Sequence, residues 1–111
     1  MGISMTPENV NAVIDTVKGT VLPEERIAMF NKACAIDPHD TVVIEELSEL
    51  IKAVSKINRC HNNEYLKSLM EEIADVIIVI ERIMRKYNIK EDDIDKLVVF
   101  KINRFIDRYG I

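Results

Sequence analysis

The chain has 111 residues, of which 48% are hydrophobic and 31% are charged, and its formal net charge is −4. This balance is typical of one folded domain, and it argues against a disordered tail or a membrane protein. The negative charge argues against nucleic-acid binding, which needs a basic surface that neutralises phosphates. With no signal peptide and two unpaired cysteines, we expect a cytoplasmic protein. A chain this short buries only about two-thirds of its surface, so we expect copies of the chain to associate.

Capping and helix-breaking residues divide the chain into five predicted helices. Their ranges are about 7–18, 23–35, 40–57, 64–87 and 91–109. Thr6 and Asp40 are good N-caps, and Gly19 is expected to end the first helix. Asn88 and Gly110 are expected to adopt the left-handed conformation that ends a helix. The basic residues that end the fourth helix are expected to complement its dipole while they remain solvated; they are Arg82, Arg85 and Lys86.

Apolar residues repeat every three or four positions in the last three predicted helices. The repeats are Val43, Leu47, Leu50, Ile51, Val54 and Ile57; Leu66, Met70, Ile73, Ile77, Ile80 and Met84; and Ile94, Leu97, Val98, Ile102 and Phe105. No stretch alternates long enough to predict a strand, so the fold class is all-α, a four- to five-helix bundle. The segment 76–80 is apolar on every side, which places Ile78 or Val79 between subunits.

Two pairs of acidic residues lie beside these apolar repeats. Glu46 and Glu49 share one face of the third helix, and Glu72 and Asp75 share one face of the fourth. If the two helices fold back on a turn at 59–63, the pairs lie about 12 Å and about 10 Å from that turn. The four carboxylates are therefore expected to meet at one height of an antiparallel hairpin.

Clustered carboxylates repel one another, so either some bind protons or a cation neutralises them. Oxygen-only ligands favour Mg²⁺, Mn²⁺ or Ca²⁺ over zinc. Mg²⁺ typically takes one or two carboxylates plus substrate phosphates, so we expect Mg²⁺, with Mn²⁺ as a possible substitute. Water held by the metal is the expected nucleophile at a phosphorus atom, and Glu45 or a ligand is expected to accept its proton. Each acidic pair alone is also typical of a solvated helix face, so the residues by themselves leave both interpretations open.

The pattern Glu45-Glu46-x-x-Glu49 followed by Glu72-x-x-Asp75 resembles the signature of the MazG-like, all-alpha nucleoside triphosphate pyrophosphohydrolases. The segment Lys101-Ile102-Asn103-Arg104 is similar to a late motif of the same family. The resemblance covers about residues 41–108. It divides the chain into an N-terminal extension with a short helix, 1–22, and a MazG-like helical domain, 23–111. Relatives carry a glycine and a glutamine just before the signature, whereas this chain has Asp37-Pro38-His39-Asp40.

The resemblance implies a magnesium-dependent hydrolase that converts a nucleoside triphosphate into a monophosphate and pyrophosphate. It implies that the metal ligands are Glu46, Glu49, Glu72 and Asp75, and that the triphosphate contacts are Lys101, Asn103 and Arg104. It also implies assembly into dimers or dimers of dimers. Two alternatives stay open. The stem of Lys101 could simply cover apolar surface while its charge stays in water. The whole chain could also be a non-catalytic oligomerisation or regulatory module.

Overall fold

The computed structural model describes residues 5–17, 23–37 and 40–111 of the chain. Within these ranges the regular elements are helices only. They are α1 (Pro7–Ile14), α2 (Pro23–Cys34), α3 (Asp40–Arg59), α4 (Asn63–Lys86) and α5 (Glu91–Tyr109). The prediction of an all-α chain with five helices is confirmed for this part of the chain, and none of these helices is long and apolar enough to cross a membrane.

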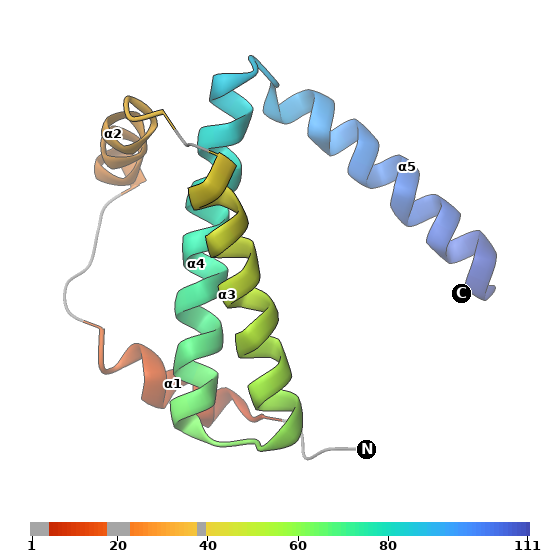
Figure 1. Ribbon diagram of the computed structural model, residues 1–111. Helices are drawn as coiled ribbons and strands as arrows, with labels where there is room; N and C mark the ends of the chain where they lie inside the picture. Colours follow the sequence, from red (N-terminus) through yellow and green to blue (C-terminus); the bar gives the residue numbers. More distant parts are fainter. Residues whose placement is uncertain (1–4, 18–22, 38–39) are drawn as a thin grey trace.

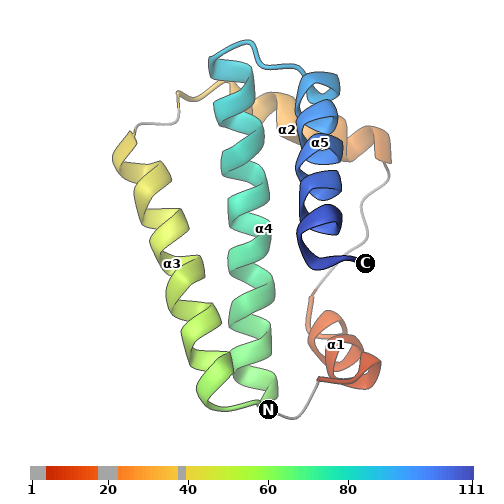
Figure 2. The same cartoon turned by 90° about the vertical axis from the view of Figure 1, so that its right-hand side faces the viewer.

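The centre of the fold is an antiparallel hairpin of α3 and α4 (Figure 1). The turn between them is closed by Asn62, whose side-chain oxygen accepts a hydrogen bond of 2.8 Å from the Tyr65 amide. α1 packs near the start of α4 and α2 near its end (Figure 2). The long helix α4 is therefore the element to which α1, α2 and α3 all attach.

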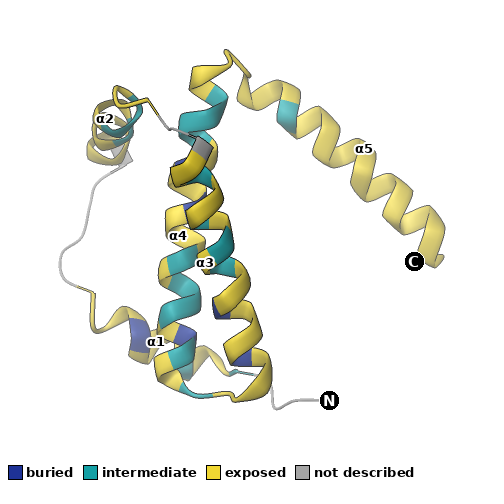
Figure 3. Cartoon of the chain, in the orientation of Figure 1, coloured by how far each residue is buried: buried dark blue, intermediate teal, exposed yellow. Residues whose placement is uncertain are grey.

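The core of the described chain is small and follows the inner side of the hairpin (Figure 3). Its buried side chains are Val13, Ala53, Ile57, Leu66, Val76 and Val79. Of the two residues of which one was predicted to lie between subunits, Val79 is only 3% exposed within one chain, and Ile78 is the one that remains exposed for such a contact. The shortage of buried side chains follows from the arrangement of the helices, since only α3 packs along much of the length of α4.

Both apolar repeats of the hairpin include residues that point away from this core. Leu47, Ile51 and Val54 of α3 are exposed, as are Ile73, Ile77 and Ile80 of α4. Each of the two helices thus has a second apolar face outside the core, because more of its circumference is apolar than one partner helix covers.

Several predicted helix ends are confirmed. Thr6 accepts a hydrogen bond from the amide of Asn9, whose side chain bonds back to the Thr6 amide, as in a capping box. Asn88 and Gly110 have φ angles of 56° and 65°, which are left-handed. α1 ends at Ile14, earlier than predicted, because the chain continues in tight turns. The predicted stop at Gly19 and the cap by the Asp40 side chain lie outside the described part of the chain.

The basic end of α4 attaches the segment around α2. The contacts are Arg82 Nη2 to the Ile36 carbonyl at 3.1 Å, Arg85 Nη1 to Asn31 Oδ1 at 2.6 Å, and Lys86 Nζ to Asp37 Oδ1 at 3.1 Å. The sequence predicted that these cations complement the helix dipole and remain solvated. Arg85 and Lys86 are exposed, whereas Arg82 is half-buried. The structure adds a tertiary role, since all three reach residues far away in the sequence.

α5 leaves the end of α4 and projects away from the hairpin (Figure 1). None of its residues is buried, and it does not pack along any other described helix. The Cα radius of gyration is 16.7 Å, whereas a compact chain of this length has a radius of about 13 Å. One copy of the chain is therefore more open than a compact domain.

Candidate metal site

Three of the four predicted metal ligands come together across the α3–α4 hairpin. One carboxylate oxygen from each of Glu46, Glu72 and Asp75 lies within 4.8 Å of the others. Glu46 comes from α3, and the other two come from successive turns of α4. The antiparallel pairing expected from the sequence thus places acids that are far apart in the chain in one small volume.

The position of these acids follows from the faces of the two helices. Glu46 precedes the buried residues Ala53 and Ile57 by seven and eleven positions, so it lies on the same side of α3. Glu72 precedes the buried Val76 and Val79 by four and seven positions, so it lies on the inner side of α4. The two glutamates extend the line of the core at the point where polar residues replace apolar ones.

The charged groups that shift the pKa of Glu72 are all negative. Partial burial raises the pKa of the Glu72 carboxyl above its ordinary value of 4.5, and the neighbouring carboxylates raise it further. These neighbours are, in decreasing order of effect, Asp75, Glu46, Glu49 and Glu71. Since every charge that shifts this pKa is negative, a proton or a cation at this carboxylate would relieve the repulsion.

Glu49 and Glu45 lie beside this group but not within it. The Glu49 Oε1 atom accepts a hydrogen bond of 3.2 Å from Lys52 Nζ, one turn along α3, and both side chains are well exposed. Glu49 is nevertheless close enough to raise the pKa of Glu72. Glu45 is exposed and precedes Glu46 by one residue, so it points about 100° away around α3.

The chemistry of the donors fits a hard divalent cation. All three close donors are carboxylate oxygens, which Mg²⁺ and Mn²⁺ accept and which zinc sites seldom use alone. None of the three residues is buried, so water and a substrate have access to the remaining coordination positions. Exposed acidic groups of this kind also occur without a metal, so the arrangement permits cation binding rather than requiring it.

The predicted triphosphate contacts lie elsewhere. Lys101, Asn103 and Arg104 are exposed on α5, and none of them forms an ion pair or hydrogen bond with the three acids. Lys101, Arg104 and Arg108 line a shallow cavity of about 260 Å³ along α5 instead. Within one chain, the structure does not bring these basic residues and the carboxylates together.

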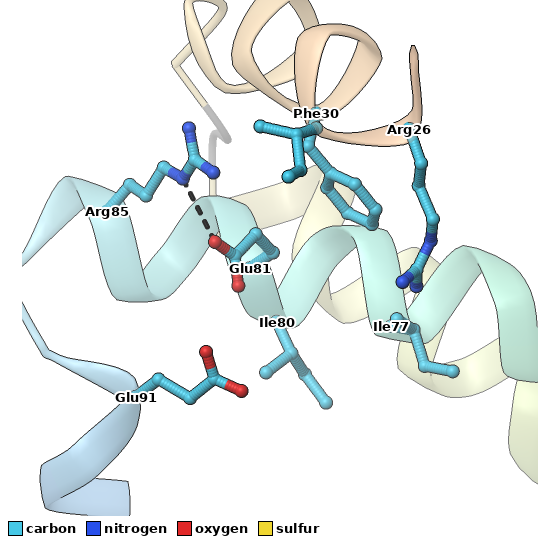
Figure 4. A pocket seen from close by; sticks show the side chains of 8 residues that line it. Arg26, Phe30, Ile77, Ile80, Glu81, Arg85 and Glu91 are labelled. Carbon is cyan, nitrogen blue, oxygen red and sulfur yellow. Dashed lines mark hydrogen bonds and ion pairs between the residues drawn. The ribbon is translucent and has the colours of Figure 1, made fainter. Parts of the chain in front are cut away.

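A larger cavity, which the sequence did not predict, lies on another side of α4 (Figure 4). It has a volume of about 650 Å³ and lies between α2, α4 and the start of α5. Its lining residues include Arg26, Phe30, Ile77, Ile80, Arg85 and Glu91. The Arg26 guanidinium lies 5.1 Å from the centre of the Phe30 ring, and Glu81 bonds to Arg85 at 3.0 Å. Of the polar contacts in this cavity, the sequence indicated only the pair of Glu81 and Arg85, through their spacing of four residues.

Comparison of the chain with protein-family models, with curated proteins and with solved structures finds no match. The carboxylate geometry and the sequence motifs therefore carry the functional argument.

Proposed function

We propose that this protein is a magnesium-dependent nucleoside triphosphate pyrophosphohydrolase. The supporting observation is the group of carboxylate oxygens of Glu46, Glu72 and Asp75, which lie within 4.8 Å of one another. The motif that contains these three residues is also the one in which the chain resembles the MazG-like enzymes. The geometry thus agrees with the motif at three of its four expected metal ligands, whereas Glu49 lies beside the group.

In this proposal Glu46, Glu72 and Asp75 would hold Mg²⁺, and Glu49, which is paired with Lys52 in the structure, would be the fourth ligand. The cation supplies Lewis-acid activation of water and neutralises phosphate charge. Water then adds to the α-phosphorus, the bond from that phosphorus to the bridging oxygen breaks, and pyrophosphate leaves. Glu45, beside the cluster and exposed, accepts the proton that the water loses.

Further parts of the proposal come from the resemblance. The chain is expected to form the helix bundle of this family as a homodimer or homotetramer. Lys101, Asn103 and Arg104 are expected to contact the triphosphate. Because these residues lie apart from the carboxylates in one chain, such contacts require an assembly or a different direction of α5.

The proposal is tested by incubating the protein with Mg²⁺ and eight ribo- and deoxyribonucleoside triphosphates, followed by measurement of pyrophosphate. We expect turnover of at least one nucleotide by the parent and none by Asp75→Asn or Glu49→Gln. Both variants should stay folded, because each loses a negative charge from a repelling group. Glu64→Gln, an exposed change in the first turn of α4, is the control and should keep full activity.

The alternative is a helical module that has no catalytic activity. The separation of α5 from the carboxylates favours it, since one chain does not contain a complete triphosphate site. Calorimetric binding of Mg²⁺ together with no turnover of any nucleotide would favour this module. Equal turnover by the parent and by Asp75→Asn would exclude the proposed role of the carboxylates.

A further inference from the structure

The apolar side of α5 is a surface that no other described helix covers. None of the helix's residues is buried; Ile94, near its start, is partly buried, and the others are exposed. The exposed residues include Val98, Ile102 and Phe105, with exposed fractions of 46%, 51% and 54%. We call these three the α5 stripe. Contiguous apolar surface of this kind is rare on a monomer and indicates an interaction site.

The α5 stripe points toward α4. Glu91, at the start of α5, lines the large cavity together with Ile77 and Ile80 of α4 (Figure 4). The three residues of the α5 stripe follow Glu91 by seven, eleven and fourteen positions. Residues at these intervals lie on one side of a helix, so the α5 stripe continues the side on which Glu91 faces α4.

The facing side of α4 is also apolar and also uncovered. Ile73, Ile77 and Ile80, which we call the α4 stripe, have exposed fractions of 42%, 47% and 47%. The two stripes meet at the junction where Ile77, Ile80 and Glu91 line one cavity, but the two helices do not pack together beyond it. The large radius of gyration also results from α5, which projects without packing along another described helix.

We propose that α5 of a second copy of this chain docks between the α4 and α5 stripes, and that each copy does this to the other. A second copy is the occupant that covers every exposed stripe at once, because it brings an uncovered α5 and presents the same space in return. α5 is about 28 Å long, and a helix of that length covered on two sides approaches the roughly 800 Å² per partner of a stable interface.

The charges of α5 favour the same partner. Its first turn is acidic, with Glu91, Asp92 and Asp93, and its second half is basic, with Lys101, Arg104 and Arg108. Two α5 helices related by a twofold axis perpendicular to them run antiparallel, which places the acidic start of each beside the basic end of the other. Charge thus fixes the direction of packing, while the stripes supply the buried apolar area.

This assembly leaves the carboxylate group open. Asp75 and Ile77 are two residues apart on α4, so their side chains point about 200° apart around the helix. A partner seated on the α4 stripe therefore does not cover the three acids. The proposal is independent of catalysis and is tested by the oligomeric state alone.

The test compares two phenylalanines of α5 that differ in the side of the helix they occupy. Phe105 belongs to the α5 stripe, whereas Phe100 is 58% exposed and lies about 140° away around the helix. We expect the parent to be a dimer by sedimentation. Phe105→Asp should weaken that dimer at least about 30-fold, as loss of a central interface residue does. Phe100→Asp should leave the dimer unchanged.

Ile73→Asp tests the α4 stripe in the same way and should also dissociate the dimer. Circular dichroism of the variants should give the helical signal of the parent, which would remove unfolding as an explanation. A monomeric parent would overturn the proposal, as would a Phe105→Asp dimer as stable as the parent. Equal dissociation by Phe100→Asp would also overturn it, because the contact would then not depend on the stripe.

Carbodiimide cross-linking of a mixture of ¹⁴N- and ¹⁵N-labelled chains, refolded together, tests the antiparallel direction. We expect mixed-isotope amide links between Lys101 and the acids at 91–95. The Lys96–Asp92 link, four residues apart within one helix, should join chains of one isotope and serves as the control. Lys101 links of one isotope only would show that α5 pairs within its own chain and would exclude the exchange.

Discussion

At the scale of single residues, Glu72 has the most unusual environment among the described acids. It lies on the inner side of α4, where the neighbouring positions along the helix are apolar, and its charged neighbours are all negative. The metal-free protein therefore carries a repulsion that folding creates, because an extended chain keeps these carboxylates apart. A proton or a cation at this one side chain would relieve the repulsion and stabilise the folded chain.

We predict that this repulsion gives the metal-free protein a characteristic pH dependence. The pKa of Glu72 is raised on folding, so the folded state binds a proton more tightly than the unfolded state. The contribution of Glu72 to the free energy of unfolding should thus fall as pH rises from the ordinary value of 4.5 through the raised pKa. Glu72→Gln should be more stable than the parent at pH 7 and equal to it near pH 4.

Urea unfolding of both proteins in EDTA, at pH 4 and pH 7, measures this difference. Glu64→Gln provides the control, because Glu64 lies in the first turn of α4 and outside the group of acids around Glu72. The difference in free energy of unfolding between Glu64→Gln and the parent should not show the same change between pH 4 and pH 7. A Glu72→Gln variant that is less stable than the parent at pH 7 would contradict the assignment of a repulsive site.

At the scale of elements, α2 is held to α4 by polar contacts near the end of α4. Arg85 reaches Asn31 of α2 and Glu81 of its own helix, and Arg82 reaches the carbonyl of Ile36. Exposed contacts of this type contribute little to the free energy of unfolding, but they determine where a short helix lies. α2 is therefore expected to open more easily than the hairpin.

We predict that Arg85→Ala loosens α2 without unfolding the chain. The free energy of unfolding should fall by less than about 1 kcal/mol, while the amide hydrogens of α2 exchange faster and those of α3 do not change. Lys67→Ala is the matched control, since Lys67 contacts only Glu71 of its own helix, at 4.0 Å. If α2 exchanged at the parent rate in Arg85→Ala, the contact with Asn31 would not hold the helix.

The five helices could be predicted because their ends carry strong local signals. The capping residue Thr6 and the left-handed residues Asn88 and Gly110 act through their own backbone neighbours, so sequence alone identifies them. The meeting of Glu46 with Glu72 and Asp75 was also predictable, because an antiparallel hairpin with a short turn leaves little choice of register.

Which apolar face of each helix enters the core could not be predicted. α4 has apolar residues on most of its circumference, and sequence periodicity identified the face of Ile73, Ile77 and Ile80. The structure instead buries Val76 and Val79, because these face α3. Periodicity shows that a helix is amphipathic, but the choice between two apolar faces is made by the helices that pack against it.

At the scale of the whole molecule, the described chain has a small core and extensive exposed apolar surface. The buried side chains cluster along the hairpin and against α1, and α5 contributes none. Such a chain gains much of its stability from whatever covers the α4 and α5 stripes. Folding and association are therefore expected to be coupled.

We predict that the thermal unfolding midpoint of the parent rises with protein concentration. Mass action stabilises a state that forms only by association, so a tenfold increase in concentration contributes up to about 1.4 kcal/mol per mole of dimer. Calorimetric scans over a hundredfold range of concentration measure this shift. Phe105→Asp should show a midpoint that is lower and independent of concentration, and a concentration-independent midpoint in the parent would argue for a self-sufficient monomer.

The left-handed conformation of Asn88 has a consequence for how copies of the chain join. This residue, with φ of 56°, lies in the short connection from which α5 departs, so its backbone angles help to set the direction of the last helix. If α5 leaves in a direction that lets two copies exchange it mutually, the product is a closed dimer. A modest change of angle would aim each α5 at a third copy, and the same apolar contacts would then generate an open-ended fibre.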